Sequence, residues 1–590
     1  MTYIAAFSSP SVALDINIQC IAIKVVLPRM EEVLLNIQAL VIPSISRHPY
    51  GTLDIKSTSR ADSSAYFAFT FPALIFSSAI ICFVAFRCFV YFSSELPPLG
   101  SGLKRLPGPR STLPYLGRIH DVDRMHAWIA LKKFSDKYNG LFACTLGGEK
   151  HIWIAKEDVA QDLLIKNAAI SSGRADLGAY PGVSKDYKYL PLLGDTKIMA
   201  RQRRFAHSVM TRNAASGFQG YIDLETRRSM FELVQRPEDF YNLIYLFCAR
   251  ITSRLAYGHD EHVQEHVANA RAFISQLGPS GPAPNLAPFL AHFPEWLVPG
   301  KSGVRIRQEK EAKLWKELFE AAKLELKQQG QRKTYVSAVL NMKEVGDKTG
   351  LLFEDEQEAL YAVGMLCTVA IFTVAGPATL FIMAMVLHPE WQAKIRQQID
   401  DIVGKDLLQM KHNPQLPLLR AAIKECVRWK TTVPMGVPRL LARDYSYDGY
   451  HFPKGAVVHV LDIAISQDPA KYENPEVFDP DRWLKESSPN FRGPLTEHPR
   501  LKGHHIFGRG KRACPGQDLA ESELIVLCGN LLKFFDFSAP KDTHGHPTLP
   551  NPDHWTTDVI GGPLPFKCDI KVRDGMKLAA IKKEYEETFA

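Results

Sequence analysis

The spacing of hydrophobic and polar positions divides the 590-residue chain into an apolar front and a long body in which helical patterns dominate. In the body, apolar residues recur every three or four positions, which is typical of amphipathic helices. This spacing predicts helices that include residues 125–138, 201–212, 305–329, 354–387, 390–403, 416–430 and 517–535. Short β-branched runs such as 456–463, which follows a Pro-Lys-Gly turn, predict a minor sheet. We therefore expect a mainly α domain with a minor β part over residues 106–572.

The apolar front contains a stretch without any charge from Ser63 to Phe86, followed by an aromatic patch. About twenty apolar residues suffice to cross the hydrocarbon core of a bilayer, so residues 63–93 are expected to form a transmembrane anchor; the alternative is a buried core helix. Residues 94–117 contain nine prolines and glycines and are expected to form a stiff hinge. Residues 1–62 are expected to form an N-terminal extension of the protein; a start codon assigned upstream of the true one would explain these residues equally well. Residues 573–590 are expected to form a C-terminal tail. The charges flanking the anchor are balanced and do not decide its orientation.

Composition and charge exclude several classes of protein. The chain carries 71 basic and 63 acidic residues, a formal net charge of +8, but the basic residues form no long run. Nucleic acid is therefore not an expected partner. The ten cysteines show no CxxC pair and no regular spacing, so neither a disulfide framework nor a zinc site is indicated. We expect the body to face a reducing compartment.

One cysteine, Cys514, is surrounded by residues that a thiol in an ordinary core would not need. The stretch FGRGKRACPG covers residues 507–516. Its glycines allow backbone conformations and close approaches that a flat macrocycle pressed against a loop requires. The helix predicted from residue 517 would direct its N-terminus at the sulfur and stabilise a thiolate. Arg512 can reach an anionic group at the rim of such a macrocycle, for example a propionate.

This stretch resembles the haem-binding loop of the cytochrome P450 superfamily, whose pattern is filled by Phe507, Gly510, Arg512, Cys514 and Gly516. The resemblance implies a cytochrome P450-like fold behind an N-terminal transmembrane helix. It also implies heme b, with its iron bound by the thiolate of Cys514. The phrases VPMGVPR and HPEWQAKIRQQID are most similar to those of membrane-anchored fungal biosynthetic members.

Three further residues fit the same resemblance. Glu425 and Arg428 are three positions apart on one face of a predicted helix, where they can pair, and they match the E-x-x-R motif of the family. Arg482, in FDPDRW, matches the residue that completes a Glu-Arg-Arg network in the family. The implied role of this network is structural, because it supports the core beneath the cysteine loop.

Two more arginines are implied to bind the haem propionates together with Arg512. Arg203 stands where the arginine of the W-x-x-x-R motif would be, although Met199 occupies the tryptophan position. Arg439 follows the segment PMGVP, as a propionate contact does in the family. The alternative for either arginine is an ordinary surface position.

The uncharged stretch 359–387 is expected to be a buried central helix rather than a second transmembrane helix, because glycines and Pro377 interrupt it. In the family this helix crosses the oxygen-binding face of the haem and carries an acid followed by a threonine. A gapless register places Thr373 at the threonine and Phe372 at the acid; another register, which needs a deletion, would use Thr379. Since Pro377 has no N–H for the carbonyl of Thr373, we expect the helix to open at Thr373.

The resemblance implies that Thr373 is the catalytic hydroxyl on the oxygen side. Leu366, Ala370, Phe372 and the loop 176–194 are expected to line an apolar substrate pocket. Proton delivery usually relies on a hydroxyl backed by an acid. Without an acid at position 372, water or a hydroxyl of the substrate would have to supply the protons.

The expected function is that of a monooxygenase that inserts one oxygen atom from O2 into a lipophilic small molecule, in secondary-metabolite biosynthesis. It would be a single-pass protein of the endoplasmic reticulum membrane with its catalytic domain on the cytosolic face. Its electrons would come from a separate NADPH-cytochrome P450 reductase. Two alternatives remain open: a haem-thiolate isomerase or dehydratase that needs no external oxygen, which the missing acid suggests, and a non-catalytic membrane haem or lipid binder.

Overall fold

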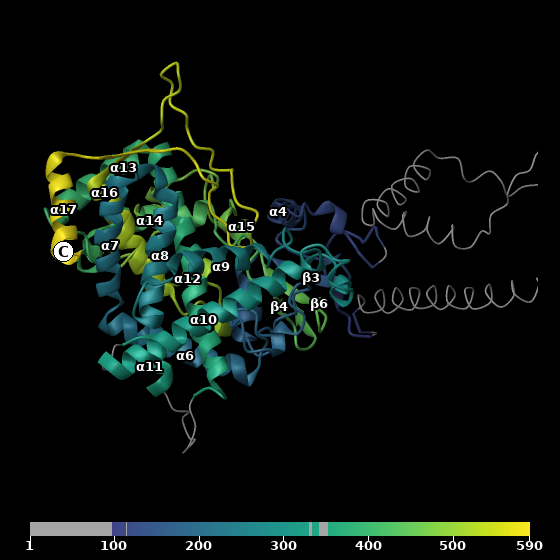
Figure 1. Cartoon of the computed structure of the whole chain (residues 1–590). Helices are drawn as coiled ribbons and strands as arrows, with labels where there is room; N and C mark the ends of the chain where they lie inside the picture. Colours follow the sequence, from purple (N-terminus) through teal and green to yellow (C-terminus); the bar gives the residue numbers. More distant parts are fainter. Residues whose placement is uncertain (1–96, 99, 114, 330–332, 342–351, 590) are drawn as a thin grey trace, which may run out of the picture. The chain divides into compact units, whose positions relative to one another are not determined.

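The computed structural model of the chain describes residues 97–98, 100–113, 115–329, 333–341 and 352–589 (Figure 1). The N-terminal extension 1–62, the expected anchor 63–93 and the first part of the hinge lie outside the described residues. Each helix expected from the periodicity of the sequence is present, with ends that differ from the expected ones by at most four residues. The mainly α domain with a minor β part is thus confirmed.

The helices of the described part make up most of the body and keep the labels of Figure 1. They are α4 (Ala127–Lys137), α5 (Glu157–Gln161), α6 (Lys197–Ser216), α7 (Phe218–Gln235), α8 (Phe240–Tyr257), α9 (Val263–Ser275), α10 (Lys301–Gln329), α11 (Tyr335–Asn341), α12 (Glu356–Leu387), α13 (Pro389–Val403), α14 (Pro417–Trp429), α15 (Asp462–Ser466), α16 (Gln517–Phe534) and α17 (Gly575–Phe589).

The strands form three small sheets. They are β1 (Lys104–Arg105), β2 (Leu141–Leu146), β3 (Glu149–Ile154), β4 (Arg439–Leu440), β5 (Tyr445–Tyr447), β6 (Tyr450–Phe452), β7 (Val457–Val460), β8 (Phe535–Ser538) and β9 (Asp569–Val572). The orders are β1-β6-β5, β2-β3-β7-β4 and β8-β9, and β3 pairs with β7 in parallel. The strand expected over 456–463 is shorter than predicted, because the chain turns into α15 at Asp462.

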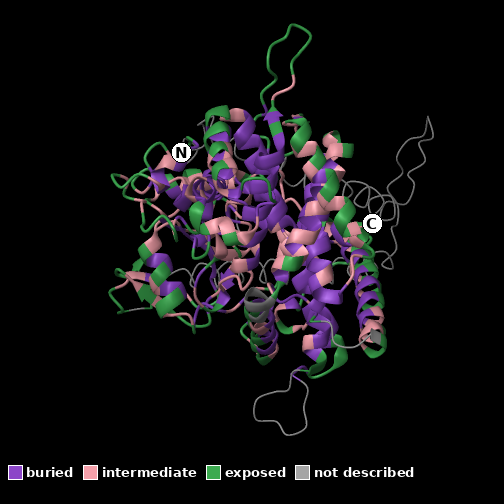
Figure 2. Ribbon diagram, turned by 90° about the vertical axis from the view of Figure 1, so that its left-hand side faces the viewer, coloured by how far each residue is buried: buried purple, intermediate pink, exposed green. Residues whose placement is uncertain are grey.

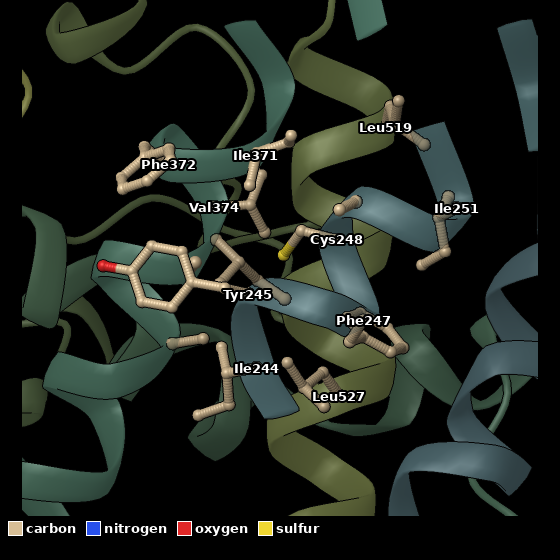
Figure 3. Packing of buried hydrophobic residues seen from close by; sticks show 14 of the residues in the cluster. Ile244, Tyr245, Phe247, Cys248, Ile251, Ile371, Phe372, Val374, Leu519 and Leu527 are labelled. Carbon is tan, nitrogen blue, oxygen red and sulfur yellow. The ribbon is translucent and has the colours of Figure 1, made fainter. Parts of the chain in front are cut away.

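Helix α12 lies at the centre of the helical part. Its N-terminus is capped by Asp355, whose side chain accepts a hydrogen bond of 2.7 Å from the N–H of Glu358. Figure 3 shows apolar side chains of α8, α12 and α16 packed against one another. The labelled ones are Ile244, Tyr245, Phe247, Cys248, Ile251, Ile371, Phe372, Val374, Leu519 and Leu527. Most residues of these three helices are buried, and Figure 2 shows that buried residues fill the interior of the helical part.

Among the described residues, α12 alone is long and apolar enough to cross a membrane, and 83% of its most apolar window is buried inside the protein. The buried central helix expected from the sequence is therefore confirmed. The expected opening at Thr373 is wrong, since α12 continues without interruption with Pro377 inside it. Proline removes one backbone hydrogen bond, and packing on both sides keeps the remaining turns in place.

The backbone of a C-terminal loop lies against α12 beside Pro377. A Cβ atom added to Gly376 would lie 3.0 Å from the carbonyl oxygen of Gly561, and one added to Gly562 would lie 3.2 Å from the Cα of Gly376. The N–H of Gly561 also donates to the carbonyl of Thr432. Three segments distant in sequence thus meet here without side chains between them.

The expected C-terminal tail is folded over its described residues, 573–589. Helix α17 packs on α7 through a stacked pair of rings, Phe231 and Tyr585, with centroids 4.0 Å apart. The carboxylate of Glu584 accepts from Arg227 at 2.8 Å, and Ile581 is buried. The single apolar face of this helix is therefore covered.

Candidate active site

The loop before Cys514 is folded by two short 3-10 turns, His505–Phe507 and Gly510–Arg512. The N–H of Cys514 donates to the carbonyl of Phe507 at 2.7 Å and closes the loop. Gly508 and Gly510 have φ of 71° and 62°, a region that favours glycine. A Cβ atom at Gly510 would also lie only 2.0 Å from the carbonyl oxygen of Leu164. The loop can take this path only with glycine at position 510.

Helix α16 begins at Gln517, so its N-terminus adjoins Cys514 as expected. Burial raises the pKa of the Cys514 thiol, while the N–H of Gly516 and the cation of Arg203 act in the opposite direction. Gly516 has φ of −90°, and an added Cβ would come no closer than 3.8 Å to the sulfur. Unlike Gly508 and Gly510, it has no conformational need for glycine.

The three arginines expected near the cysteine all lie in its surroundings. Arg203, on α6, donates to the carbonyl of Ala513 at 2.7 Å. Arg439, at the start of β4, donates through Nη2 to the carbonyl of Arg509 at 2.7 Å. Arg512 donates to two carbonyls, those of Ser172 at 2.8 and 2.9 Å and Leu193 at 2.6 Å. The structure therefore brings these arginines together around the cysteine loop.

A fourth arginine, Arg174, joins this group and was missed in the sequence. It donates to the carbonyls of Pro191 at 3.0 Å and Val437 at 2.9 Å. Burial lowers its pKa well below the usual value, and the cations of Arg512, Arg439 and Arg203 lower it further. In the sequence it stands in the segment SSGRADLG, two residues before Asp176, and no motif marks it.

Arg174, Arg439 and Arg512 are buried and Arg203 is half-buried, and the four form a cationic cluster without salt-bridge partners. Burial and neighbouring arginines lower the pKa of Arg439 and of Arg512, each to about 10. No salt bridge among the described residues involves Arg174, Arg203, Arg439 or Arg512. Nη1 of Arg439 is buried and has no hydrogen-bond partner among the described residues. Buried charges are normally paired. The cluster and the adjacent thiol fit a flat cofactor that carries carboxylates.

A second charged cluster, in which every charge is paired, lies beneath the cysteine loop. Arg428 binds Glu425 through two hydrogen bonds of 2.7 and 2.9 Å, and both side chains are fully buried. Arg482 donates to the same carboxylate at 3.0 Å, and Trp483 does so at 2.9 Å. Arg428 also donates to the carbonyls of Ser466, Pro475 and Val477. The Glu-Arg-Arg arrangement expected from the sequence is present in the structure.

One face of α12 is less buried than the rest of the helix. From Tyr361 to Val386, the residues that are not fully buried are Val369, Ala370 and Thr373. Thr373 donates its hydroxyl to the carbonyl of Val369 at 3.0 Å. Thr379, the hydroxyl of the other register, is fully buried and donates to the carbonyls of Ala375 and Gly376. This contrast favours the register that uses Thr373.

Phe372 and Leu366, both expected in the substrate pocket, are buried in the core. The ring of Phe372 lies 4.8 Å from that of Tyr245 on α8, and the guanidinium of Arg271 on α9 lies 5.1 Å from its centroid. Figure 3 shows Phe372 next to Tyr245. Consecutive residues of a helix point about 100° apart, so Phe372 does not share the face of Thr373. The aromatic ring at the acid position packs α8, α9 and α12 together.

Comparisons with known proteins agree with this geometry. Residues 106–567 match the model of the family "Cytochrome P450". The chain is 30% identical over 499 residues to cytochrome P450 monooxygenase COX1 of Coprinopsis cinerea, covering 82% of this chain and 94% of that protein. It is 28% identical over 506 residues to cytochrome P450 monooxygenase virE of Hypocrea virens, covering 84% and 91%. A zebra fish cytochrome P450 solved with abiraterone superimposes with a TM-score of 0.61 at 20% identity, over 76% of this chain and 100% of that one, which shows the shared fold.

Proposed function

Since the chain belongs to the cytochrome P450 family and is a haem-thiolate monooxygenase, we propose that Cys514 is its iron ligand and Thr373 its hydroxyl on the oxygen side. The relatives named above are monooxygenases. Their names support oxygen insertion over the isomerase, dehydratase and binder alternatives. The observation that carries the assignment of the site is the cluster of four arginines without acidic partners beside Cys514.

The bound haem would supply the activation of dioxygen. The residues of this chain would hold it. Arg203, Arg439, Arg512 and Arg174 have the charge and the free donor capacity to bind its carboxylates. Phe507, Gly510 and Gly516 complete the loop that carries the thiol. A coordinated metal ion would offset the effect of burial on the pKa of Cys514.

Thr373 is proposed to hold and pass a proton at Oγ1. Its hydroxyl is half-buried on the least buried face of α12, while its bond to the carbonyl of Val369 leaves the oxygen free to accept. Phe372 carries no proton, so water or the substrate would supply protons to Thr373. Ala370, one turn before Thr373, keeps this face open for a substrate.

The substrate is proposed to be a lipophilic small molecule of secondary metabolism, because apolar side chains dominate the segments around α12. Electrons are proposed to come from NADPH through a separate cytochrome P450 reductase. The apolar stretch 63–93 supports anchoring in a membrane by a single span. The endoplasmic reticulum as that membrane, and the cytosolic face for the catalytic domain, are proposed from the resemblance to membrane-anchored fungal members.

The test is the absorption spectrum of the reduced, CO-bound full-length protein in membranes, with wild type beside Cys514→Ser. We expect the Soret band that is shifted by a thiolate ligand in the wild type and its loss in the variant. Haem-containing wild-type protein without that band would overturn the assignment of Cys514. Glu523→Gln on the same helix serves as a control, since Glu523 is buried away from the thiol's hydrogen bonds and its variant should keep the band.

A further inference from the structure

A buried histidine of the cysteine loop, His505, is held at both nitrogens of its ring by one short helix. Its Nδ1 lies 3.2 Å from Oδ1 of Asp462, and its Nε2 lies 3.3 Å from the hydroxyl oxygen of Ser466. Asp462 and Ser466 are the first and last residues of α15, and a spacing of four places them on the same face of the helix. Ser466 and Asp462 are buried, and the side chain of His505 is only 6% exposed. The ring is therefore fixed in position and in orientation.

These contacts decide which nitrogen of the ring carries the proton. A carboxylate only accepts hydrogen bonds, so Nδ1 of His505 donates to Asp462. In the neutral ring Nε2 is then the acceptor, and the hydroxyl of Ser466 donates to it. A hydrogen bond to a charged group is stronger than one between neutral groups. The bond to Asp462 is accordingly the stronger of the two.

Helix α15 is itself bound to the paired charges beneath the loop. Arg428 donates to the carbonyl of Ser466 at 3.1 Å through Nη1, while its Nε and Nη2 bind Glu425. Ser466 thus contacts Arg428 through its backbone and His505 through its side chain. The Glu425–Arg428 pair therefore reaches the cysteine loop through one residue of α15 and one histidine.

Asp462 also lies near a second residue of the same loop. Its carboxylate is 3.9 Å from Nη1 of Arg509. The other nitrogens of that guanidinium bind Glu157 of α5 at 2.6 and 3.0 Å. His505 and Arg509 stand on either side of Phe507 in the sequence. One buried carboxylate thus holds the loop on both sides of Phe507.

The turn that begins at His505 leads to the thiol. The carbonyl of His505 accepts from the N–H of Gly508 at 2.9 Å and closes the first 3-10 turn of the loop. Phe507 lies inside this turn, and its carbonyl accepts from the N–H of Cys514 at 2.7 Å. A rotation of the turn would carry that carbonyl away from Cys514. Fixing the ring of His505 therefore fixes the acceptor of the cysteine's own N–H.

The two sides of Cys514 are held by different elements. On the carbonyl side, Gln517 of α16 donates to the carbonyl of Cys514 at 3.0 Å, and it accepts from the N–H of Gly503 at 2.8 Å. On the N–H side the partner is Phe507, in the turn that His505 begins. Helix α16 thus secures one side of the cysteine, and the other side depends on the turn.

We propose that His505 is a positioning residue for the iron ligand. Held by Asp462 and Ser466, it keeps the carbonyl of Phe507 on the N–H of Cys514 and so keeps Cys514 in the conformation that binds the iron. This rests on the proposed function for the identity of the iron ligand. The positioning itself concerns the conformation of residues 505–514.

The first test uses the reduced, CO-bound spectrum of the full-length haem protein. The ratio of the thiolate-shifted Soret band to the unshifted band measures how much of the protein keeps the cysteine ligand. His505→Leu removes both ring contacts, so we expect this ratio to fall about tenfold while far-UV circular dichroism stays that of wild type. His505→Asn keeps a nitrogen that donates to Asp462, so its ratio should stay within about twofold of wild type. A loss in His505→Asn as large as in His505→Leu would contradict the role of the bond to Asp462.

The matched control is His504→Leu, which makes the same replacement at the neighbouring position. The ring of His504 accepts one long hydrogen bond, of 3.5 Å from the N–H of Ile506, and its Nε2 is buried without a partner among the described residues. Its variant should keep the wild-type ratio. Equal ratios in His504→Leu and His505→Leu would overturn the positioning role.

A double-mutant cycle tests whether Asp462 acts through His505. Asp462→Asn replaces the charged acceptor by a neutral one, so we expect it to lower the ratio of the two Soret bands several-fold in the wild-type background. In the His505→Leu background it should cause no further loss, because the bond it weakens is already absent. Additive losses in the double variant would show that Asp462 supports the loop by another route.

The second test is hydrogen exchange of the full-length protein, followed by mass spectrometry of peptides that cover residues 504–516. Loss of the bond between Cys514 and Phe507 should make these amides exchange about tenfold faster in His505→Leu, but not in His504→Leu. Wild-type protein that binds haem without the thiolate-shifted band would end the proposed function, and hydrogen exchange would still decide the positioning role. A normal band in wild type, with unchanged ratio and exchange in His505→Leu, would overturn the positioning role alone.

Discussion

At the scale of single residues, two clusters of charged side chains differ in whether the chain itself supplies their counter-charge. In the first group Glu425 serves two arginines, so every charge has a partner inside the protein. In the second group four arginines have carbonyl partners and no acid within the described part of the chain. The first group is complete in the chain itself. The second group needs a bound anion as its counter-charge, and the carboxylates of a haem at the proposed site would supply it.

We predict that Glu425→Gln lowers the free energy of unfolding by about 3 to 5 kcal/mol, because it leaves Arg428 and Arg482 buried without a counter-charge. Chemical denaturation followed by circular dichroism measures this. The matched control is Glu309→Gln, which removes one carboxylate from an exposed pair with Arg305 and should leave the midpoint unchanged. A midpoint for Glu425→Gln equal to that of the control would contradict the structural role of the network.

The residues that sequence patterns revealed are those whose chemistry depends on spacing. Cys514, its glycines and the Glu425–Arg428 pair stand at fixed separations along the chain, so a motif can contain them. Arg174 reaches the same place from a loop more than 300 residues earlier, and only the fold brings it there. At position 372 the sequence was informative in part. It showed that the acid of the family motif is replaced by Phe372, but not that the ring of Phe372 packs against Tyr245.

At the scale of elements, long helices were predictable because their apolar faces repeat over many turns. The strands have two to six residues, too few to establish a period, and only the piece around β7 was expected. Helix α17 has one buried position, Ile581, and so gave a weak pattern. Whether Pro377 breaks α12 depends on what packs against the helix, namely α8 and the backbone of Gly561 and Gly562, and no local pattern contains that information.

The two registers considered for α12 lead to a prediction with an internal control. Thr373→Val, which removes a half-buried hydroxyl and keeps the shape, should raise the share of NADPH electrons released as hydrogen peroxide by about tenfold. Thr379→Val removes a fully buried hydroxyl and should leave that share unchanged, while lowering stability by about 1 kcal/mol. Peroxide and NADPH are measured together, with a cytochrome P450 reductase and a lipophilic probe substrate. The reverse pattern would assign the role to Thr379.

At the scale of the whole molecule, buried neutral histidines limit stability in acid. His266 on α9 is fully buried and contacts the sulfur of Cys367 at 3.9 Å. Burial, with smaller effects from His262 and His259, lowers its pKa from 6.5 to about 4, and the carboxylate of Glu265 opposes this shift only in part. The folded protein therefore binds a proton here less readily than the unfolded chain does. The stability from this site is complete above pH 6.5 and is lost as the pH falls towards 4.

We predict that the free energy of unfolding of the wild type falls by up to about 1.4 kcal/mol per pH unit from this histidine below pH 6.5. In His266→Asn, which stays neutral, the slope between pH 6 and 4 should be smaller by that amount. Denaturant titrations at a series of pH values measure both slopes. Parallel slopes for the two proteins would show that His266 does not titrate on unfolding.

The contact of Gly376 with Gly561 and Gly562 couples the evolution of a position in the middle of the domain to two positions near its C-terminal end. A methyl group at Gly562 fits against α12 only while position 376 stays bare, since the Cβ would already lie 3.2 Å from the Cα of Gly376. The effects of changes at the two sites are therefore expected to be epistatic, and each glycine limits which neighbours the other can acquire.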